Sequence, residues 1–332
     1  MIWLTLRQFR AHLLAAFGAL ALLALYLVRL GGEIRDFYDT RITGCTGHAC
    51  FVARMELRSL YDDQVQLTGV MLIAVPALIG IFWGAPLVTR ELEERTDRLV
   101  WNQSVTRSRW LVVKLGLISL IGAVVTGLFS LLLTWSASRY DEVVGERFAA
   151  VFFGARNIVP IGYGLFAFVL GTVVGMIVRR TLPAMTITLT VFAAIQLLVP
   201  MAVRQNLMPP VTETVTIDAS VLERGVGLSL ETDNTFTIRG YNVPGGWELA
   251  DSARIFRPDG TPFTGTDASP CIALGPDQEA GNNCIAAQNP HFTHTYQPGG
   301  RYWAFQWIEL SLYLALSLML AGFGFLRFRV RQ

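Results

Sequence analysis

Six long apolar stretches constrain the fold of this 332-residue chain more than any other feature. A helix needs about 20 apolar residues to cross a hydrocarbon layer that is about 30 Å thick. Each stretch therefore predicts a transmembrane helix. The six predicted spans are Ala11–Leu30, Leu67–Val88, Leu115–Ser138, Asn157–Val178, the stretch between Arg180 and Arg204, and Trp303–Leu326.

The composition agrees with a polytopic membrane protein. Hydrophobic residues make up 52% of the chain and charged residues 16%, whereas a soluble domain carries about 25% charged residues. This excludes a disordered or fibrous chain and argues against a soluble enzyme. The first apolar stretch is too long for a signal peptide and no small-residue cleavage site follows it, so we expect a retained span.

The basic residues predict the orientation of the spans. With a cytoplasmic N-terminus, 13 basic residues fall in the inner segments 1–12, 89–114, 179–180 and 327–332. The two short outer loops, 29–66 and 139–156, hold only eight. Because cytoplasmic loops carry the excess of Lys and Arg, both termini are predicted to be cytoplasmic.

All four cysteines lie on the outer side in this topology. Disulfides persist in oxidising compartments, so Cys45–Cys50 and Cys271–Cys284 are predicted as local bridges. The alternative is a metal site that also uses His48, His291 and His294, but Cys45-x4-Cys50 is not a strong zinc signature. We favour the disulfides and predict no metal.

Segment 203–302 differs in composition from the rest, with nine of the 14 prolines and 11 of the 30 glycines. Apolar residues alternate in it with polar ones, and alternation bounded by Gly and Pro indicates strands. One such run holds Val211, Val215, Ile217 and Ala219, and another holds Phe236 and Ile238. We expect a small β-rich outer domain between the fifth and sixth spans, and a helical stretch over Ala53–Gln66.

The first ten residues place Ile2, Leu6 and Phe9 on one helical face and basic side chains toward the other. This pattern predicts a short amphipathic helix at the cytoplasmic surface, although a simple extension of the first span would also fit. The predicted class is an all-α polytopic membrane protein with this interfacial helix and a β-rich extracytoplasmic domain. Its parts are 1–10, the spans 11–202 with outer loop 31–66 and inner loop 89–110, the outer domain 203–302, and 303–332.

The sequence lacks several motifs of catalysis. It has no Gly-x4-Gly-Lys-Ser/Thr phosphate loop, no Gly-x-Ser-x-Gly elbow and no His-Glu-x-x-His zinc motif. No predicted span has His, Asp, Lys or Arg in its core, and the one carboxylate within an apolar run, Glu309, lies near the outer end. This scarcity of ionisable residues argues against an ion-coupled transporter. If the chain moves a solute uphill, we expect the energy to come from another polypeptide.

The inner loop between the second and third spans combines charges of both signs with Leu92, Leu99, Val100 and Trp101. Two interpretations are equally supported by its composition. The loop could press on another protein, or it could form an amphipathic surface helix with pairs such as Glu91–Arg95 and Glu94–Arg98. The other inner connection, Arg179-Arg180, is too short to reach far.

The residues of this loop also resemble a known family. They read Gly84-Ala85-Pro86-Leu87-Val88-Thr89-Arg90-Glu91-Leu92-Glu93, then Thr96, Arg98-Leu99 and Gln103-Ser104-Val105-Thr106-Arg107-x-Arg109-Trp110-Leu111. The stretch closely resembles permease subunits of the type-2 ABC exporter family, actinobacterial members in particular. The resemblance extends to the amphipathic start, the six spans and the enlarged outer region before the last one.

This resemblance implies a permease without enzyme activity or cofactor of its own, in a bacterial plasma membrane. ATP and Mg would bind to two copies of a separate ABC ATPase. A second permease copy is also implied, with a homodimer favoured over a heterodimer, and the lipid bilayer is the remaining partner, with no nucleic acid. Export by alternating access is the expected mechanism. The substrate class is expected from the apolar spans instead, which would suit a hydrophobic or amphipathic molecule in a cavity between the subunits.

The resemblance further implies a coupling helix in the inner loop that docks on the ATPase. The residues assigned to it are Glu91, the main charged anchor, with Leu92, Glu94, Arg95, Arg98, Leu99 and Trp101. A different class remains as the alternative function: a membrane-anchored sensor whose outer domain binds a ligand. Two glycine pairs, Gly80-x3-Gly84 and Gly171-x3-Gly175, could bring helices close within one subunit, which we favour, or across a dimer.

Overall fold

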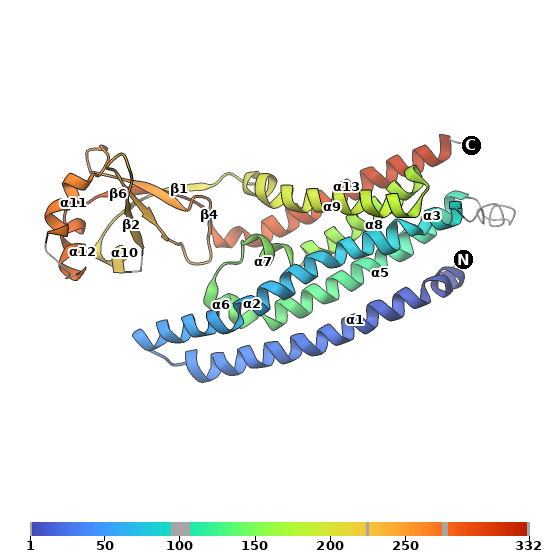
Figure 1. Ribbon diagram of the computed structural model, residues 1–332, viewed down its shortest axis with the longest axis horizontal. Coiled ribbons are helices and arrows are strands. Elements are labelled where there is room, and N and C mark those ends of the chain that lie inside the picture. The colour runs from blue at the N-terminus through green and yellow to red at the C-terminus, as the bar shows by residue number, and fades with distance from the viewer. Residues whose placement is uncertain (1, 94–106, 224–225, 274–277, 331–332) are drawn as a thin grey trace. The chain divides into compact units, whose positions relative to one another are not determined.

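The computed structural model describes residues 2–93, 107–223, 226–273 and 278–330 (Figure 1). It divides into two compact units. The first combines Met1–Leu207 with Trp303–Gln332 and is helical, and the second is Met208–Tyr302 and contains the strands. The second unit is therefore inserted in the chain just before the last long helix.

Within the part of the chain that the structure describes, six helices are long and apolar enough to cross a membrane, which confirms the predicted number of spans. Their ranges are Phe17–Ile42, Ala49–Arg90, Leu115–Ser136, Val159–Val178, Thr181–Asn206 and Gly299–Arg327. The orientation of the termini stays a prediction.

The helical unit is built from the following elements. The first half holds α1 (Ile2–Phe37), η1 (Tyr38–Ile42), α2 (His48–Ile79), η2 (Gly80–Gly84), α3 (Pro86–Glu93) and α5 (Arg107–Ser136). The second half holds α6 (Ser138–Val144), α7 (Ala150–Gly154), α8 (Val159–Val178), α9 (Thr181–Leu198), η3 (Val199–Val203), η4 (Arg204–Asn206) and α13 (Tyr302–Val330).

The first helix runs through residues 2–37 without a break. The backbone thus shows no boundary between the predicted surface helix 1–10 and the first span, and the position of these residues at the membrane surface stays a prediction. The predicted helix over Ala53–Gln66 is present and forms part of α2. Loop 31–66 is therefore mostly a continuation of two membrane helices.

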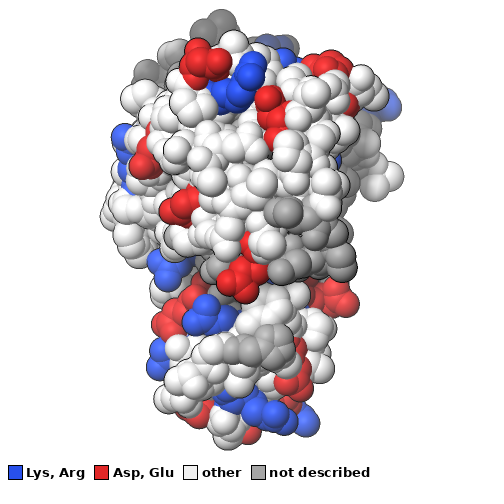
Figure 2. All heavy atoms as spheres, turned by 90° about the vertical axis from the view of Figure 1, so that its left-hand side faces the viewer, with Lys and Arg blue, Asp and Glu red and all other residues white. Residues whose placement is uncertain are grey.

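This helical extension has an apolar core of its own. Leu30 and Ile34 of α1 pack with Leu57 and Val65 of α2 and with Tyr140 of α6. Burial of such side chains stabilises the extension by removing apolar surface from water. On the outside of the extension, Arg58 donates to Glu146 at 2.8 Å, and Figure 2 shows acidic and basic side chains mixed on the face it draws.

Helix α8 is the central helix of the first unit. Its span is 67% buried within the chain, against 17% for the span Thr181–Asn206. Phe168 and Val173 of α8 share one core with Ile79 of α2 and Val125 of α5. Any movement of α8 must therefore displace side chains of the neighbouring helices, because such cores are close-packed.

The second unit contains a six-stranded antiparallel sheet of order β1-β6-β5-β3-β2, with β4 also paired to β6. Its strands are β1 (Val211–Thr216), β2 (Gly227–Leu230), β3 (Phe236–Arg239), β4 (Trp247–Glu248), β5 (Ser252–Phe256) and β6 (His291–Gln297). Its helices are α10 (Ala219–Glu223), α11 (Gly265–Ile272) and α12 (Gln278–Ala286), followed by the short η5 (Gly299–Arg301). A small sheet region in this half of the chain is thus confirmed, and its extracytoplasmic location stays a prediction.

The alternating pattern is explained by the core of this unit. Ile217, Phe236 and Ile238 are buried together with Ile255 and Phe292. Successive side chains of a strand point to opposite faces of the sheet. In each strand, the alternate positions that carry apolar residues therefore lie on the side of the sheet that faces the core.

Candidate functional site

The predicted coupling residues are only partly described by the structure. Glu91 and Leu92 lie on the last turns of α3, which ends at Glu93. The remaining five fall in segment 94–106, outside the described residues: Glu94, Arg95, Arg98, Leu99 and Trp101. The site that can be built is therefore the junction from which the loop departs, where α3 meets α8 and α9.

A local change in helix geometry places α3 at this junction. The backbone between α2 and α3 forms a π-helical turn over Gly80–Gly84, in which the N–H of Ala85 donates to the carbonyl of Gly80 at 2.9 Å. Such turns insert an extra residue into a helix and are frequent at functional sites. Pro86, which lacks an N–H, then begins α3 where a helix tolerates it.

The two glycine pairs pack against each other within this chain. A Cβ at Gly171 would lie 2.2 Å from the carbonyl oxygen of Gly80, and one at Gly84 would lie 2.5 Å from the carbonyl oxygen of Phe168. A Cβ at Gly175 would lie 2.7 Å from the carbonyl oxygen of Ala85. The structure thus confirms the intrachain interpretation, and the glycines let the backbone of α8 touch that of the π-helical turn.

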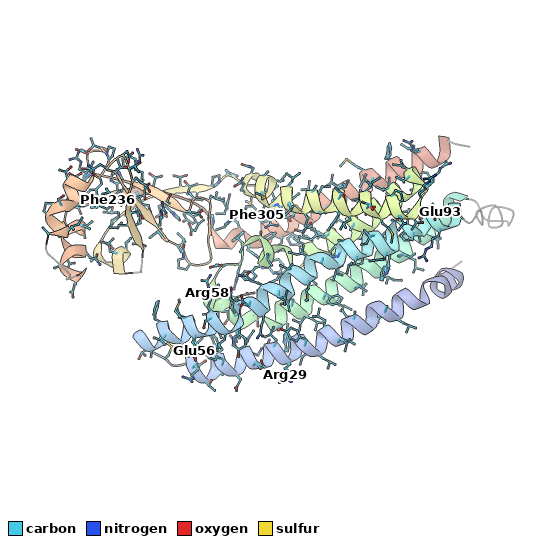
Figure 3. All side chains as sticks on the ribbon, viewed as in Figure 1. Arg29, Glu56, Arg58, Glu93, Phe236 and Phe305 are labelled. Carbon is cyan, nitrogen blue, oxygen red and sulfur yellow. A yellow bond between two sulfur atoms is a disulfide. The ribbon has the colours of Figure 1, made fainter. Side chains whose placement is uncertain are left out.

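Glu93 joins the end of α3 to the beginning of α9. Its Oε1 accepts the backbone N–H of Thr181 at 2.8 Å, and its Oε2 accepts the hydroxyl of Thr181 at 2.7 Å. The same hydroxyl lies 2.8 Å from that of Thr89, which is buried one turn earlier in α3. Figure 3 shows Glu93 at the end of the helical unit opposite to Arg58 and Glu56.

The electrostatics of this contact follow from the ends of helices. The first N–H groups of a helix have no partner within it, and a carboxylate there is favourable. Arg180 takes an extended conformation just before α9, so that Thr181 is its first residue. The hydrogen bonds from Thr181, with the nearby charge of Arg180, lower the pKa of the Glu93 carboxyl.

The sequence did not single out Glu93, and the assignment of Glu91 as the ATPase anchor stays a prediction. The connection Arg179-Arg180 was expected to be too short to reach far, and in the structure it brings the start of α9 beside α3. Arg179 adopts the left-handed conformation at φ 57°, which turns the chain sharply after α8. The sequence held one signal for this contact. A connection of only two residues places the start of α9, with its unpaired N–H groups, next to the end of α8.

A second polar cluster lies inside the helical unit, near the outer ends of its spans by the predicted topology. Arg204 donates from Nε to Oε2 of Glu309 at 2.8 Å and from Nη2 to Oε1 at 3.0 Å. The hydroxyl of Tyr163 in α8 also donates to Oε1, at 2.5 Å. The guanidinium also lies 4.1 Å from the ring centre of Phe153. Because Arg204 pairs with Glu309, this apolar region holds an ion pair and not a lone carboxylate.

The cysteines pair as the sequence predicted. Cys45 and Cys50 are bonded across the tip between η1 and α2, and Cys271 and Cys284 join α11 to α12. The Cα atoms of the two pairs are 5.2 Å and 5.4 Å apart. Among the residues that the structure describes, no group of three or more His, Cys, Asp or Glu could hold a metal ion.

Comparison with known proteins gives one match. The family model described as "ABC-2 membrane transporter related" matches residues 17–204. The matched range is more than half of the chain and contains the first four spans, nearly all of the fifth, the inner loop and the Glu93–Thr181 contact. No curated protein and no solved structure matches the chain.

Proposed function

Because this chain belongs to the ABC-2 membrane transporter related family, we propose that it is the membrane-spanning permease subunit of an ATP-driven exporter. The family supports a multi-pass permease component of an ABC transporter and implies a partner ATPase subunit. The match over residues 17–204 is the observation that carries the proposal, because it spans both the membrane helices and the inner loop.

The proposed mechanism divides the work between two kinds of chain. Two ATPase copies hydrolyse ATP with Mg, and two permease copies form the path through the bacterial plasma membrane. The coupling residues within 89–110 dock on the ATPase, and closure of the ATPase pair moves this loop. The π-helical turn that leads into α3 touches α8 backbone to backbone, with Gly80 against Gly171 and Ala85 against Gly175. A displacement of α3 and this turn is therefore passed to the central helix as a rigid-body shift.

The substrate class is proposed from the surface that the helices offer. Large apolar side chains are exposed along several spans, among them Leu120, Leu131, Leu197 and Leu318. The charged groups Arg204 and Glu309 satisfy each other and offer little to a charged solute. A hydrophobic or amphipathic molecule that reaches the permease from the bilayer fits these features.

Co-expression with a candidate ABC ATPase from the same genome tests the proposal. The permease should bind that ATPase in detergent, and ATP should drive an amphipathic dye across vesicles that contain the complex. An ATPase variant without its phosphate-loop lysine should bind but transport nothing. Co-purification with a kinase or regulator, with no ATPase bound, would instead support a sensor with an extracytoplasmic ligand-binding domain.

A further inference from the structure

We propose that Glu93 is a positioning residue that makes α9 follow the movement of the inner loop. The inference rests on the proposed function, which gives the loop a role but names no route from it to α9. Residues 94–106 of this loop follow Glu93 directly, so a displacement of the loop acts on the end of α3 that carries this side chain. Glu93 then passes the displacement to the first turn of α9.

The contact between Glu93 and Thr181 can transmit a displacement of α3 to the first turn of α9. Both carboxylate oxygens of Glu93 bind Thr181, one through its backbone N–H at 2.8 Å and one through its hydroxyl at 2.7 Å. Two hydrogen bonds to different groups of one residue fix the direction of the side chain as well as its distance. Hydrogen bonds with a charged partner are about twice as strong as neutral ones, so the contact resists separation.

Thr89 makes the contact a three-residue clasp of Glu93, Thr181 and Thr89. The Thr89 hydroxyl lies 2.8 Å from that of Thr181 and 3.0 Å from the carbonyl oxygen of Ala85. Because Thr89 is fully buried, it holds the Thr181 hydroxyl in place from the protein side while Glu93 approaches from the solvent side. The clasp therefore ties α9 to two successive turns of α3.

The two joints of α3 differ in kind. Toward α8 the contact is made by the π-helical turn that leads into α3, backbone against backbone at Gly80, Gly84 and Gly171, which leaves no room for adjustment. Toward α9 the clasp consists of hydrogen bonds, one partner of which is exposed to solvent. Helix α9 is also the least buried of the six spans. Without the clasp, α8 would still follow α3, whereas α9 would lose the polar link to it.

Thiol labelling can follow α9 separately from the rest. All four native cysteines are in disulfides, so a cysteine introduced at an exposed position is the free thiol that reacts. Leu182→Cys reports on the start of α9 and Val112→Cys on the start of α5, at the other end of the same loop, because both side chains are exposed. The maleimide labelling rate is measured in the permease–ATPase complex without nucleotide and after trapping with ATP and vanadate.

The clasp is then weakened in each background by Glu93→Gln or Thr181→Val, with Thr181→Ser as the conservative variant. Glu142→Gln is the matched control, since Glu142 is an exposed carboxylate in an ion pair with Arg139 elsewhere in the unit. We expect Glu93→Gln to reduce the nucleotide-induced change at Leu182→Cys by at least about threefold, a size consistent with losing one charged hydrogen bond. The change at Val112→Cys should persist, and Thr181→Ser should behave as wild type.

The outcomes separate this inference from the proposed function. If nucleotide changes the labelling rate of neither reporter when the clasp is intact, the proposed function as an ATP-driven permease is overturned. If Val112→Cys responds and Leu182→Cys does not, or if both respond unchanged in Glu93→Gln and Thr181→Val, the role of Glu93 is overturned. Loss of both responses in Glu93→Gln would also overturn it, because Glu93 would then act on the whole loop and not on α9.

Discussion

The ion pair between Arg204 and Glu309 joins the end of the fifth membrane helix to the sixth, and its side chains are only 1% and 0% exposed. Buried charges are tolerated when they are paired and hydrogen-bonded. Here the carboxylate also accepts the hydroxyl of Tyr163, and the ring of Phe153 covers the guanidinium. The cluster thus links four elements of the unit, α7, α8, η4 and α13.

Removing one partner of this pair should strongly destabilise the permease. Arg204→Ala leaves the carboxylate of Glu309 buried without its counter-ion, and such losses cost about 3–5 kcal/mol. The combined change Arg204→Met with Glu309→Leu should cost less than either single change, because no unpaired charge remains. Thermal unfolding in detergent measures this. Arg29→Ala, which breaks the exposed pair with Glu33, should cost less than about 1 kcal/mol.

The sequence predicted the spans well but not this pair. Apolar length and charge density identify a membrane helix locally, whereas Arg204 and Glu309 are 105 residues apart and meet only through the arrangement of α8, α13 and η4. From the sequence we predicted that Arg204 lies just outside the fifth span and that Glu309 is a lone carboxylate. In the structure the span extends to Asn206, so Arg204 lies within it.

The close packing of α8 on the π-helical turn predicts a graded set of glycine variants. Gly171→Ala brings a Cβ within 2.2 Å of a backbone oxygen that cannot rotate away. Overpacking of this kind costs about 1–3 kcal/mol or more. Gly116→Ala in α5 meets nothing within 4 Å and should be neutral or slightly stabilising in a helix. Equal melting temperatures for the two variants would contradict the packing described here.

The glycine motifs show what spacing alone leaves open. Both pairs were visible in the sequence as surfaces for close helix contact, but the spacing is the same for an intrachain and a dimer interface. Glu93 shows a different limit. One of its two partners is the backbone N–H at the start of another helix, a group that no residue type marks in a sequence.

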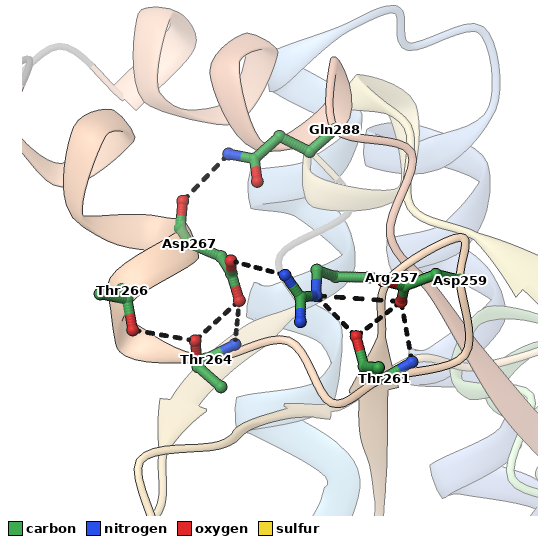
Figure 4. A network of polar contacts seen from close by, with 7 residues as sticks. All are labelled: Arg257, Asp259, Thr261, Thr264, Thr266, Asp267 and Gln288. Atoms are coloured by element: carbon green, nitrogen blue, oxygen red, sulfur yellow. Dashed lines mark hydrogen bonds and ion pairs between the residues drawn. The ribbon is translucent and has the colours of Figure 1, made fainter.

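The second unit should lose stability in acid through Asp267 (Figure 4). Asp267 caps α11 by accepting the hydroxyl and the N–H of Thr264, and these bonds lower its pKa below the usual 3.8. Because the folded pKa is depressed, the stabilisation is present above about pH 4 and is lost as the pH falls through the lowered value. Arg257, 3.4 Å away, favours the same ionised form.

The variant Asp267→Asn tests this pH dependence in the full chain. At pH 6 it should be less stable than wild type by about 1 kcal/mol, the usual size of a capping contribution. The difference should shrink as the pH falls through the lowered pKa of Asp267, where wild type loses its charge too. Asp251→Asn, at an exposed position, serves as the control and should track wild type at both pH values. A constant difference across the range would refute the assignment.

The predicted topology places Ser229 outside the cell and Ser108 inside. Because the native cysteines are paired, Ser229→Cys and Ser108→Cys each add one free thiol. A membrane-impermeant maleimide should label the first in intact cells and the second only after permeabilisation. Reaction of Ser108→Cys from outside, or of Ser229→Cys only after permeabilisation, would show the topology to be wrong.

Glu91 remains the predicted contact between the inner loop and the ATPase, and it is distinguishable from Glu93 by what its loss should change. It lies near the end of α3, so Glu91→Ala should leave the permease folded but lower substrate-stimulated ATP hydrolysis per assembled complex. Trp101→Ala should also weaken association, because a large aromatic side chain is a typical interface anchor.

If these residues only cover the end of the span, Glu91→Ala will instead lower the melting temperature and leave hydrolysis unchanged. Measuring both quantities on one purified complex decides between the two roles, and unchanged coupling in both variants would remove this loop from the ATPase contact.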